Sequence, residues 1–282
     1  MPQTFASTST NLNGKVYPSV GRCIYCGSQN DLTKEHILPF GLSGTALLLK
    51  SSCRACAAMT GNVEQRVLRG SFWPVRVFRD LKSRTKHRDA PESYPMTLLY
   101  GERVKVLELP IDHIPILLHF PHFAPPTHLS GAPTVQGINV SRMPSILFGK
   151  VRPDVVAREL GATEFQFHIP ESPVFFARMI AKIGYAFAWA EGAIHDVELP
   201  SPVIPAILGQ TEDIGAWVGT LDKPYESHPG TMHRLELFRD LERRLLFAEV
   251  QLFADSQTPS YGVILGRLKG EVGGDGKVPF IR

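Results

Sequence analysis

The chain has 282 residues, of which 43% are hydrophobic, 20% charged and 9% aromatic. These proportions are those of a folded globular protein and exclude a disordered or fibrous chain. No run of about eighteen apolar residues is free of charge and no apolar signal core opens the chain, so we expect a cytoplasmic protein without a membrane span. The net charge is only +3, but residues 21–88 hold twelve Lys and Arg against four Asp and Glu, which favours a polyanion as the partner of this part.

The composition divides the chain into three segments. Residues 1–18 are rich in Ser, Thr and Asn and have no hydrophobic periodicity, so we expect a flexible tail. Residues 19–88 contain all the cysteines and most of the excess positive charge. Residues 89–282 begin with a proline-containing linker and continue with short apolar segments separated by turn residues, which predicts a second, α+β domain.

Four cysteines form two C-x2-C pairs, Cys23 with Cys26 and Cys53 with Cys56. In a reducing compartment this arrangement favours a structural Zn²⁺ held by four thiolates over a disulfide framework. A redox dithiol and free thiols are the alternatives. The gap between the two pairs is longer than in a simple zinc ribbon, so another element must lie between them.

That gap contains the segment TKEHILP at residues 33–39, in which Glu35 directly precedes His36. The pattern C-x2-C … EHI-x-P … C-x2-C resembles the zinc-knuckle members of the HNH endonuclease family, over about a quarter of the chain. The resemblance implies a ββα-metal fold, in which a β-hairpin packs on a helix. It also implies a catalytic Mg²⁺ or Mn²⁺, with His36 as the general base and Glu35 as a metal ligand.

These roles are chemically reasonable. Histidine can take a proton from water at neutral pH, and a hard divalent ion prefers carboxylate oxygens. Adjacent residues of a strand point to opposite faces, so Glu35 and His36 can serve one ion only if the strand bends or bulges there.

One position departs from the family pattern. Many zinc-knuckle members have a metal-binding Asn directly after the last cysteine, where this chain has Ala57. We expect a helix to begin near Cys56, and on it Glu64 is a better replacement ligand than Asn62, because Glu64 shares a face with Thr60. If neither residue reaches the ion, the module can keep its zinc and lose its activity.

A basic helical segment follows. Four arginines fall on one broad arc of a helical wheel and are candidate phosphate contacts, with a solvated face as the alternative reading. They are Arg66, Arg69, Arg76 and Arg79. Pro74 must kink or break this helix.

The remainder is less informative about function. Residues 96–156 predict several short strands. Ser172 and Pro173 predict a helix start and Gly192 a stop, so residues 174–191 should form a buried helix. Its two charged residues, Arg178 and Lys182, must reach water or bind an anion. Residues 246–252 and 261–265 predict a hairpin.

The sequence therefore predicts an α+β protein in which a metal-dependent HNH module hydrolyses phosphodiester bonds in DNA. The resemblance also implies a role in bacterial restriction or phage defence. A non-catalytic, zinc-dependent nucleic-acid-binding protein is the alternative, and a protein whose zinc only stabilises a small domain is a third reading. The sequence leaves open whether the chain is a homodimer.

Overall fold

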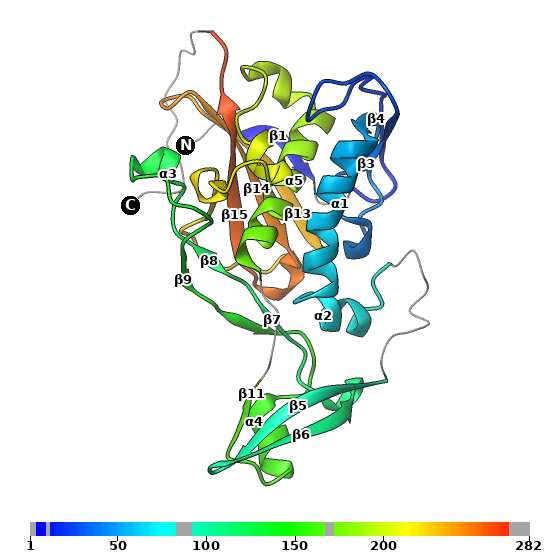
Figure 1. The fold of residues 1–282 in the computed structure, drawn as a ribbon, viewed down its shortest axis with the longest axis vertical. Helices are drawn as coiled ribbons and strands as arrows, with labels where there is room; N and C mark the ends of the chain where they lie inside the picture. The colour runs from blue at the N-terminus through cyan, green and yellow to red at the C-terminus, as the bar shows by residue number, and fades with distance from the viewer. Residues whose placement is uncertain (1–3, 10–11, 83–91, 167–171, 271–282) are drawn as a thin grey trace.

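The computed structural model describes residues 4–9, 12–82, 92–166 and 172–270. Within them the chain is a mixed α and β protein with several small sheets, as the sequence predicts (Figure 1). Its α-helices are α1 (Arg54–Arg69), α2 (Trp73–Phe78), α3 (Thr127–Ser130), α4 (Pro153–Glu159), α5 (Pro173–Ala190) and α6 (Ile204–Leu208). Short 3-10 helices cover Phe40–Leu42, Ile111–His113, Ala193–Asp196, Ile214–Ala216 and Ala254–Ser256. Among the described residues, no helix combines the length and the apolarity needed to cross a bilayer.

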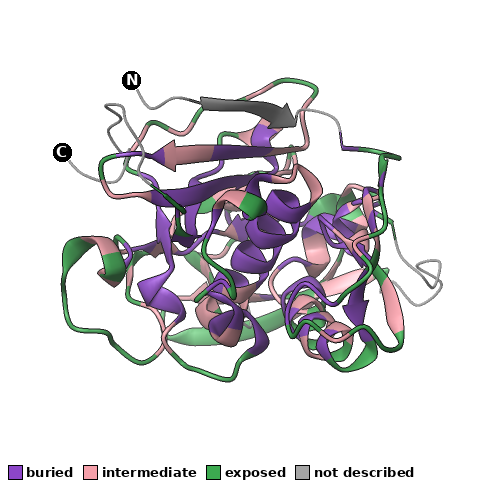
Figure 2. Cartoon of the chain, turned by 90° about the horizontal axis from the view of Figure 1, so that it is seen from above, coloured by how far each residue is buried: buried purple, intermediate pink, exposed green. Residues whose placement is uncertain are grey.

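The largest sheet has five antiparallel strands. In spatial order they are β1 (Thr4–Ser9), β13 (His233–Asp240), β14 (Leu245–Leu252), β15 (Ser260–Arg267) and β12 (Val218–Thr220). Helix α5 packs on β14 and β15, and Figure 2 shows buried residues gathered where helix and sheet meet. A Cβ atom added to Gly184 would lie 2.8 Å from the Cβ of Ala248, so this glycine lets the helix approach the sheet closely.

The predictions for α5 and for the hairpin of β14 and β15 are confirmed. The helix starts at Pro173, and Gly192 directly follows its C-cap with a φ of 75°. In β14, Glu249 and Gln251 alternate with apolar residues, a pattern that predicts a strand with one solvated face, but every residue of this strand is buried. Its two polar side chains remain buried because they have partners: Glu249 pairs with Lys223 and Arg234, and Gln251 donates to backbone carbonyls.

The expected flexible tail differs from the structure. Residues 4–9 form β1, which pairs with β13 at the edge of the sheet. An edge strand offers a row of unpaired N–H and C=O groups, and an extended segment rich in Ser and Thr can pair with it without supplying a hydrophobic pattern of its own. Pairing of this kind depends on a distant strand, so the local composition does not report it.

The cysteine-containing part has a three-stranded sheet, in the order β2 (Val16–Tyr17), β4 (Leu47–Cys53), β3 (Leu32–His36). Strands β3 and β4 are antiparallel, and α1 follows β4 without a gap. Pro74 lies in the first turn of α2, so the predicted basic helix is broken into α1 and α2. Residues 83–88, the end of the predicted module, lie outside the described residues.

The hydrophobic core does not divide at residue 88. One continuous cluster of buried residues runs from Leu12 through the cysteine-containing part and α5 to Leu268. A separate small core belongs to an outlying unit that projects from this body (Figure 1). That unit consists of α4 and the sheet β11 (Glu164–Gln166), β5 (Ser93–Tyr100), β6 (Arg103–Pro110).

Two further ribbons connect the unit to the body. They pair β7 (Leu117–His119) with β10 (Ser145–Leu147) and β8 (His122–Phe123) with β9 (Val140–Arg142). The prediction of several short strands in this region is confirmed.

Candidate functional site

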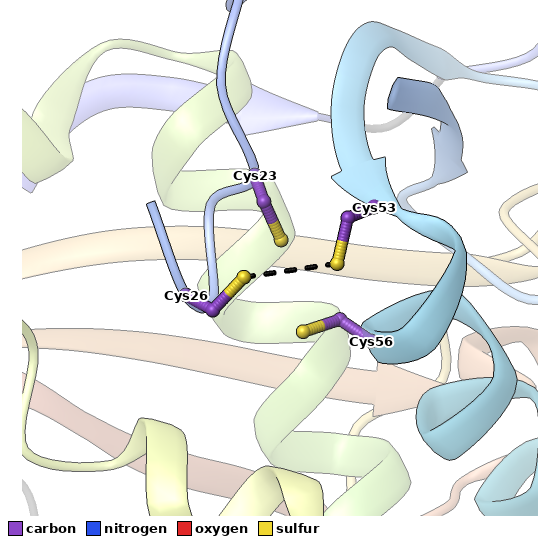
Figure 3. A group of neighbouring side chains, drawn as sticks. All are labelled: Cys23, Cys26, Cys53 and Cys56. Atoms are coloured by element: carbon purple, nitrogen blue, oxygen red, sulfur yellow. Dashed lines mark hydrogen bonds between the residues drawn. The ribbon is translucent and has the colours of Figure 1, made fainter. Parts of the chain in front are cut away.

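The four cysteines meet at one point (Figure 3). Their Sγ atoms all lie within 4.8 Å of one another, and those of Cys26 and Cys53 are 3.7 Å apart. Four thiolates at about 2.3 Å from a tetrahedral Zn²⁺ would be about 3.8 Å from each other, so the cluster fits such an ion. The cluster can therefore hold a metal ion such as zinc.

Local structure brings the two pairs together. The first pair lies on a turn in which Gly27 N–H donates to the carbonyl of Cys23, while Cys53 ends β4 and Cys56 is in the first turn of α1. A hydrogen bond from the backbone N–H of Cys56 lowers the pKa of Cys53 to about 7. This favours the thiolate of Cys53, which is the form that binds metal, whereas burial raises the pKa of Cys56.

The irregularity in this hairpin lies before the EH motif and on the opposite strand, while Glu35 and His36 pair in regular register with Leu48 and Leu47, so the expected bulge between them is not present. Thr33 pairs with Ser52, but Glu35 pairs with Leu48, so the extra residues lie on β4, where Lys50 has a φ of 43°. Glu35 is buried, whereas His36 is half-buried, with its ring 5.7 Å from that of Phe40.

Glu35 and Glu64, the two predicted metal ligands, come together on a lysine. The Nζ of Lys182 lies 2.8 Å from Oε1 of Glu35 and 2.9 Å from Oε1 of Glu64. It also donates to the backbone carbonyl of His36. The side chains are 1% exposed for Lys182, 8% for Glu35 and 19% for Glu64, so strand β3 and helices α1 and α5 meet at a buried cluster of charges.

The protonation equilibria reflect this burial. Burial raises the pKa of Glu35, and the positive charge of Lys182 opposes that shift. Burial would lower the pKa of Lys182, but the two carboxylates outweigh it and raise the pKa above its usual value. Lys182 is therefore charged in the folded protein. A buried Lys in an apolar helix is a signal that it has an anionic partner, although the sequence does not say which one.

The four predicted arginines separate into two groups. Arg66 and Arg69 are exposed on α1, and the guanidinium of Arg66 lies 4.4 Å from the ring of Phe175. Arg76 is buried and donates to the carbonyls of Gly41 and Leu68. Only the first pair is placed on the surface as the prediction of phosphate contact requires.

Arg79 is engaged inside the protein. Its Nη1 lies 2.8 and 3.1 Å from the two carboxylate oxygens of Asp255, and its Nη2 donates to the hydroxyl of Ser256. Its guanidinium also lies over the rings of Phe148 and Phe253. The helical wheel assumes one continuous helix and therefore places the four arginines on one face. The chain breaks between α1 and α2, so Arg76 and Arg79 contact other parts of the protein.

Comparison of the chain with known proteins found no matching family model, no matching curated protein and no matching solved structure.

Proposed function

We propose that the chain is an endonuclease of the HNH type that hydrolyses phosphodiester bonds in DNA. The observation that carries the proposal is that Glu35 and Glu64, supplied by a β-hairpin and the helix that follows it, converge on Lys182 in the part of the chain that also brings four cysteines together. The backbone carbonyl of His36 lies at the same point. The expected resident cofactor is a structural Zn²⁺ at the cysteines.

In this proposal His36 is the general base that takes a proton from the attacking water. Arg66 and Arg69 on the exposed side of α1 hold the DNA by its phosphates. The catalytic Mg²⁺ or Mn²⁺ that the resemblance implies does not fit between Glu35 and Glu64 in this arrangement, because Lys182 binds the Oε1 atom of each. No step of the cleavage is therefore assigned to that ion.

The second candidate is a zinc-dependent nucleic-acid-binding protein without catalysis. Two observations favour it, namely Lys182 between the candidate metal ligands and Ala57 where the family has Asn. Such a protein would bind DNA or RNA through its basic surface, with an affinity that falls steeply with salt.

Plasmid cleavage separates the two candidates. We would compare the wild-type protein, His36→Ala and the control His113→Ala, whose side chain is 70% exposed, each with and without Mg²⁺ or Mn²⁺. Zinc content is measured first, so that loss of the fold is not mistaken for loss of a base. Nicking by the wild type and the control, but not by His36→Ala, supports the nuclease. Equal nicking by all three contradicts the role of His36. Salt-sensitive binding without cleavage favours the second candidate.

A further inference from the structure

The ammonium group of Lys182 is completely satisfied. A lysine has three N–H donors, and Nζ has three acceptors here: Oε1 of Glu35, Oε1 of Glu64 and the carbonyl oxygen of His36. The acceptors come from both parts of the predicted metal site, the strand with the EH motif and the helix after the last cysteine. The oxygen atoms that would surround a bound metal ion at this site therefore surround the ammonium group of Lys182 instead.

A divalent ion and Lys182 would compete for the same atoms. Mg²⁺ binds oxygen at about 2.0–2.1 Å and needs six ligands in an octahedron. An ion that bridges the two Oε1 atoms would lie beside Nζ, which is itself 2.8 and 2.9 Å from them. Two positive charges would then share one small buried site.

Lys182 cannot easily leave. Its side chain is 1% exposed, and its helix neighbours Ala181 and Ile183 are fully buried against the core. Removing one partner from a buried ion pair is strongly destabilising, because a charge remains buried without a partner. The helix α5 that carries Lys182 is packed on both α1 and the large sheet, so the position of Nζ is held by the core.

We propose that Lys182 is the resident cation of this site and takes the place of a divalent ion between Glu35 and Glu64. The chain then binds a metal such as zinc at its cysteines and neither Mg²⁺ nor Mn²⁺ at the two carboxylates. This inference rests on the proposed function, because that proposal is the reason to treat Glu35 and Glu64 as metal ligands. Its test is a binding measurement that does not require cleavage.

The test uses the full zinc-loaded chain and measures Mn²⁺ binding by electron paramagnetic resonance. The wild type should bind no Mn²⁺ at a stoichiometric site. Lys182→Met leaves two neighbouring carboxylates without a cation and should gain one stoichiometric Mn²⁺, because carboxylate oxygens are the preferred ligands of such ions. Lys182→Met with Glu35→Gln should lose this gain.

Lys223→Met is the matched control, because Lys223 also pairs with a buried carboxylate, that of Glu249, and its removal should create no Mn²⁺ site. One stoichiometric Mn²⁺ in the wild type, lost in Glu35→Gln, would overturn the inference. A folded Lys182→Met that binds no Mn²⁺ would also overturn it. If Lys182→Met does not fold, the wild type and Glu35→Gln still decide, because their binding is measured without it. A protein that cuts no DNA but gives the expected Mn²⁺ results would refute the nuclease and leave Lys182 as the resident cation.

Discussion

Tyr185 on helix α5 donates a 2.7 Å hydrogen bond to the backbone carbonyl of Ile24, which lies between the first two cysteines. The ring of Tyr185 also lies 5.8 Å from that of Tyr25 in the same turn. Helix α5 therefore contacts the turn that carries Cys23 and Cys26, through a buried hydrogen bond and an aromatic contact. The state of the cluster should be transmitted to the whole fold.

Removal of the zinc that we propose at the cysteines should therefore destabilise the entire chain and not only residues 19–88. Structural zinc contributes about 10 kcal/mol or more in small zinc-binding peptides, and even about 4 kcal/mol would lower the Tm by roughly 10 °C in a chain of this size. The measurement is thermal unfolding followed by circular dichroism, before and after chelation, and for Cys56→Ala. Added Zn²⁺ should restore the wild type and not the variant. A Tm that does not change on chelation would contradict the structural role of the metal.

The free energy of unfolding should decrease as the pH is lowered, because the buried His233 resists protonation in the folded protein. Its Nε2 lies 3.0 Å from the carbonyl of Leu42, and its Nδ1 accepts a hydrogen bond from the N–H of Phe253. Burial lowers the pKa of His233 to about 4, while the charge of Asp255 raises this pKa and the charge of Arg79 lowers it. The unfolded chain takes up a proton near pH 6.5 while the folded chain does not, so the stability is complete above about pH 6.5 and is lost as the pH falls toward 4.

The loss is at most about 3 kcal/mol, since one pKa unit corresponds to about 1.4 kcal/mol. Urea unfolding at several pH values between 7.5 and 5 measures it. His233→Gln, which keeps a donor and an acceptor, should remove about one proton from the pH dependence. The exposed His113→Gln should leave the dependence of the wild type unchanged, and an identical slope in all three proteins would refute the assignment.

The elements that local sequence specifies were predictable, and the contacts between distant elements were not. Ser172, Pro173 and Gly192 mark the ends of α5, and the two C-x2-C pairs predict their own meeting, because each signal is complete within a few residues. The carbonyl of His36, one of the three acceptors of Lys182, is 146 residues away along the chain, and no periodicity connects the two residues. The pairing of β1 with β13 was missed for the same reason.

The surface and interior arginines should behave differently on substitution. Arg66→Ala with Arg69→Ala should weaken DNA binding and reduce the slope of log affinity against log salt by about 2, because each phosphate contact contributes about one unit. Fluorescence anisotropy at several salt concentrations measures this. Arg103→Ala with Arg158→Ala, in the outlying unit, changes the charge equally and should leave the slope unchanged.

Arg79→Lys should instead lower the Tm with little effect on DNA affinity. Lysine has one nitrogen and no planar guanidinium, so it cannot bind Asp255 and Ser256 from two separate nitrogens or stack on Phe148 and Phe253. Loss of these partly buried contacts costs about 1–3 kcal/mol. A variant that keeps its stability and loses DNA binding would show that Arg79 meets the nucleic acid.

Two glycine substitutions in helices should have opposite signs. Gly184→Ala would place its Cβ 2.8 Å from that of Ala248 and push α5 from the sheet, at a cost of about 1–3 kcal/mol. Gly61→Ala on α1 would meet nothing within 4 Å and should gain about 0.5–1 kcal/mol in helix stability. Chemical denaturation of both variants measures the difference, and a stable Gly184→Ala would contradict the close approach of helix and sheet.

The continuous core has a consequence for dissection and transfer of the cysteine-containing part. A fragment that ends near residue 88 would lose Lys182 and Tyr185, so Glu35 and Glu64 would face each other without a counter-ion and the carbonyl of Ile24 would lose its donor. Such a fragment should not fold when it is transferred alone. Grafting it onto another protein would require α5, or a helix that supplies a lysine and a tyrosine at the same spacing, to travel with it.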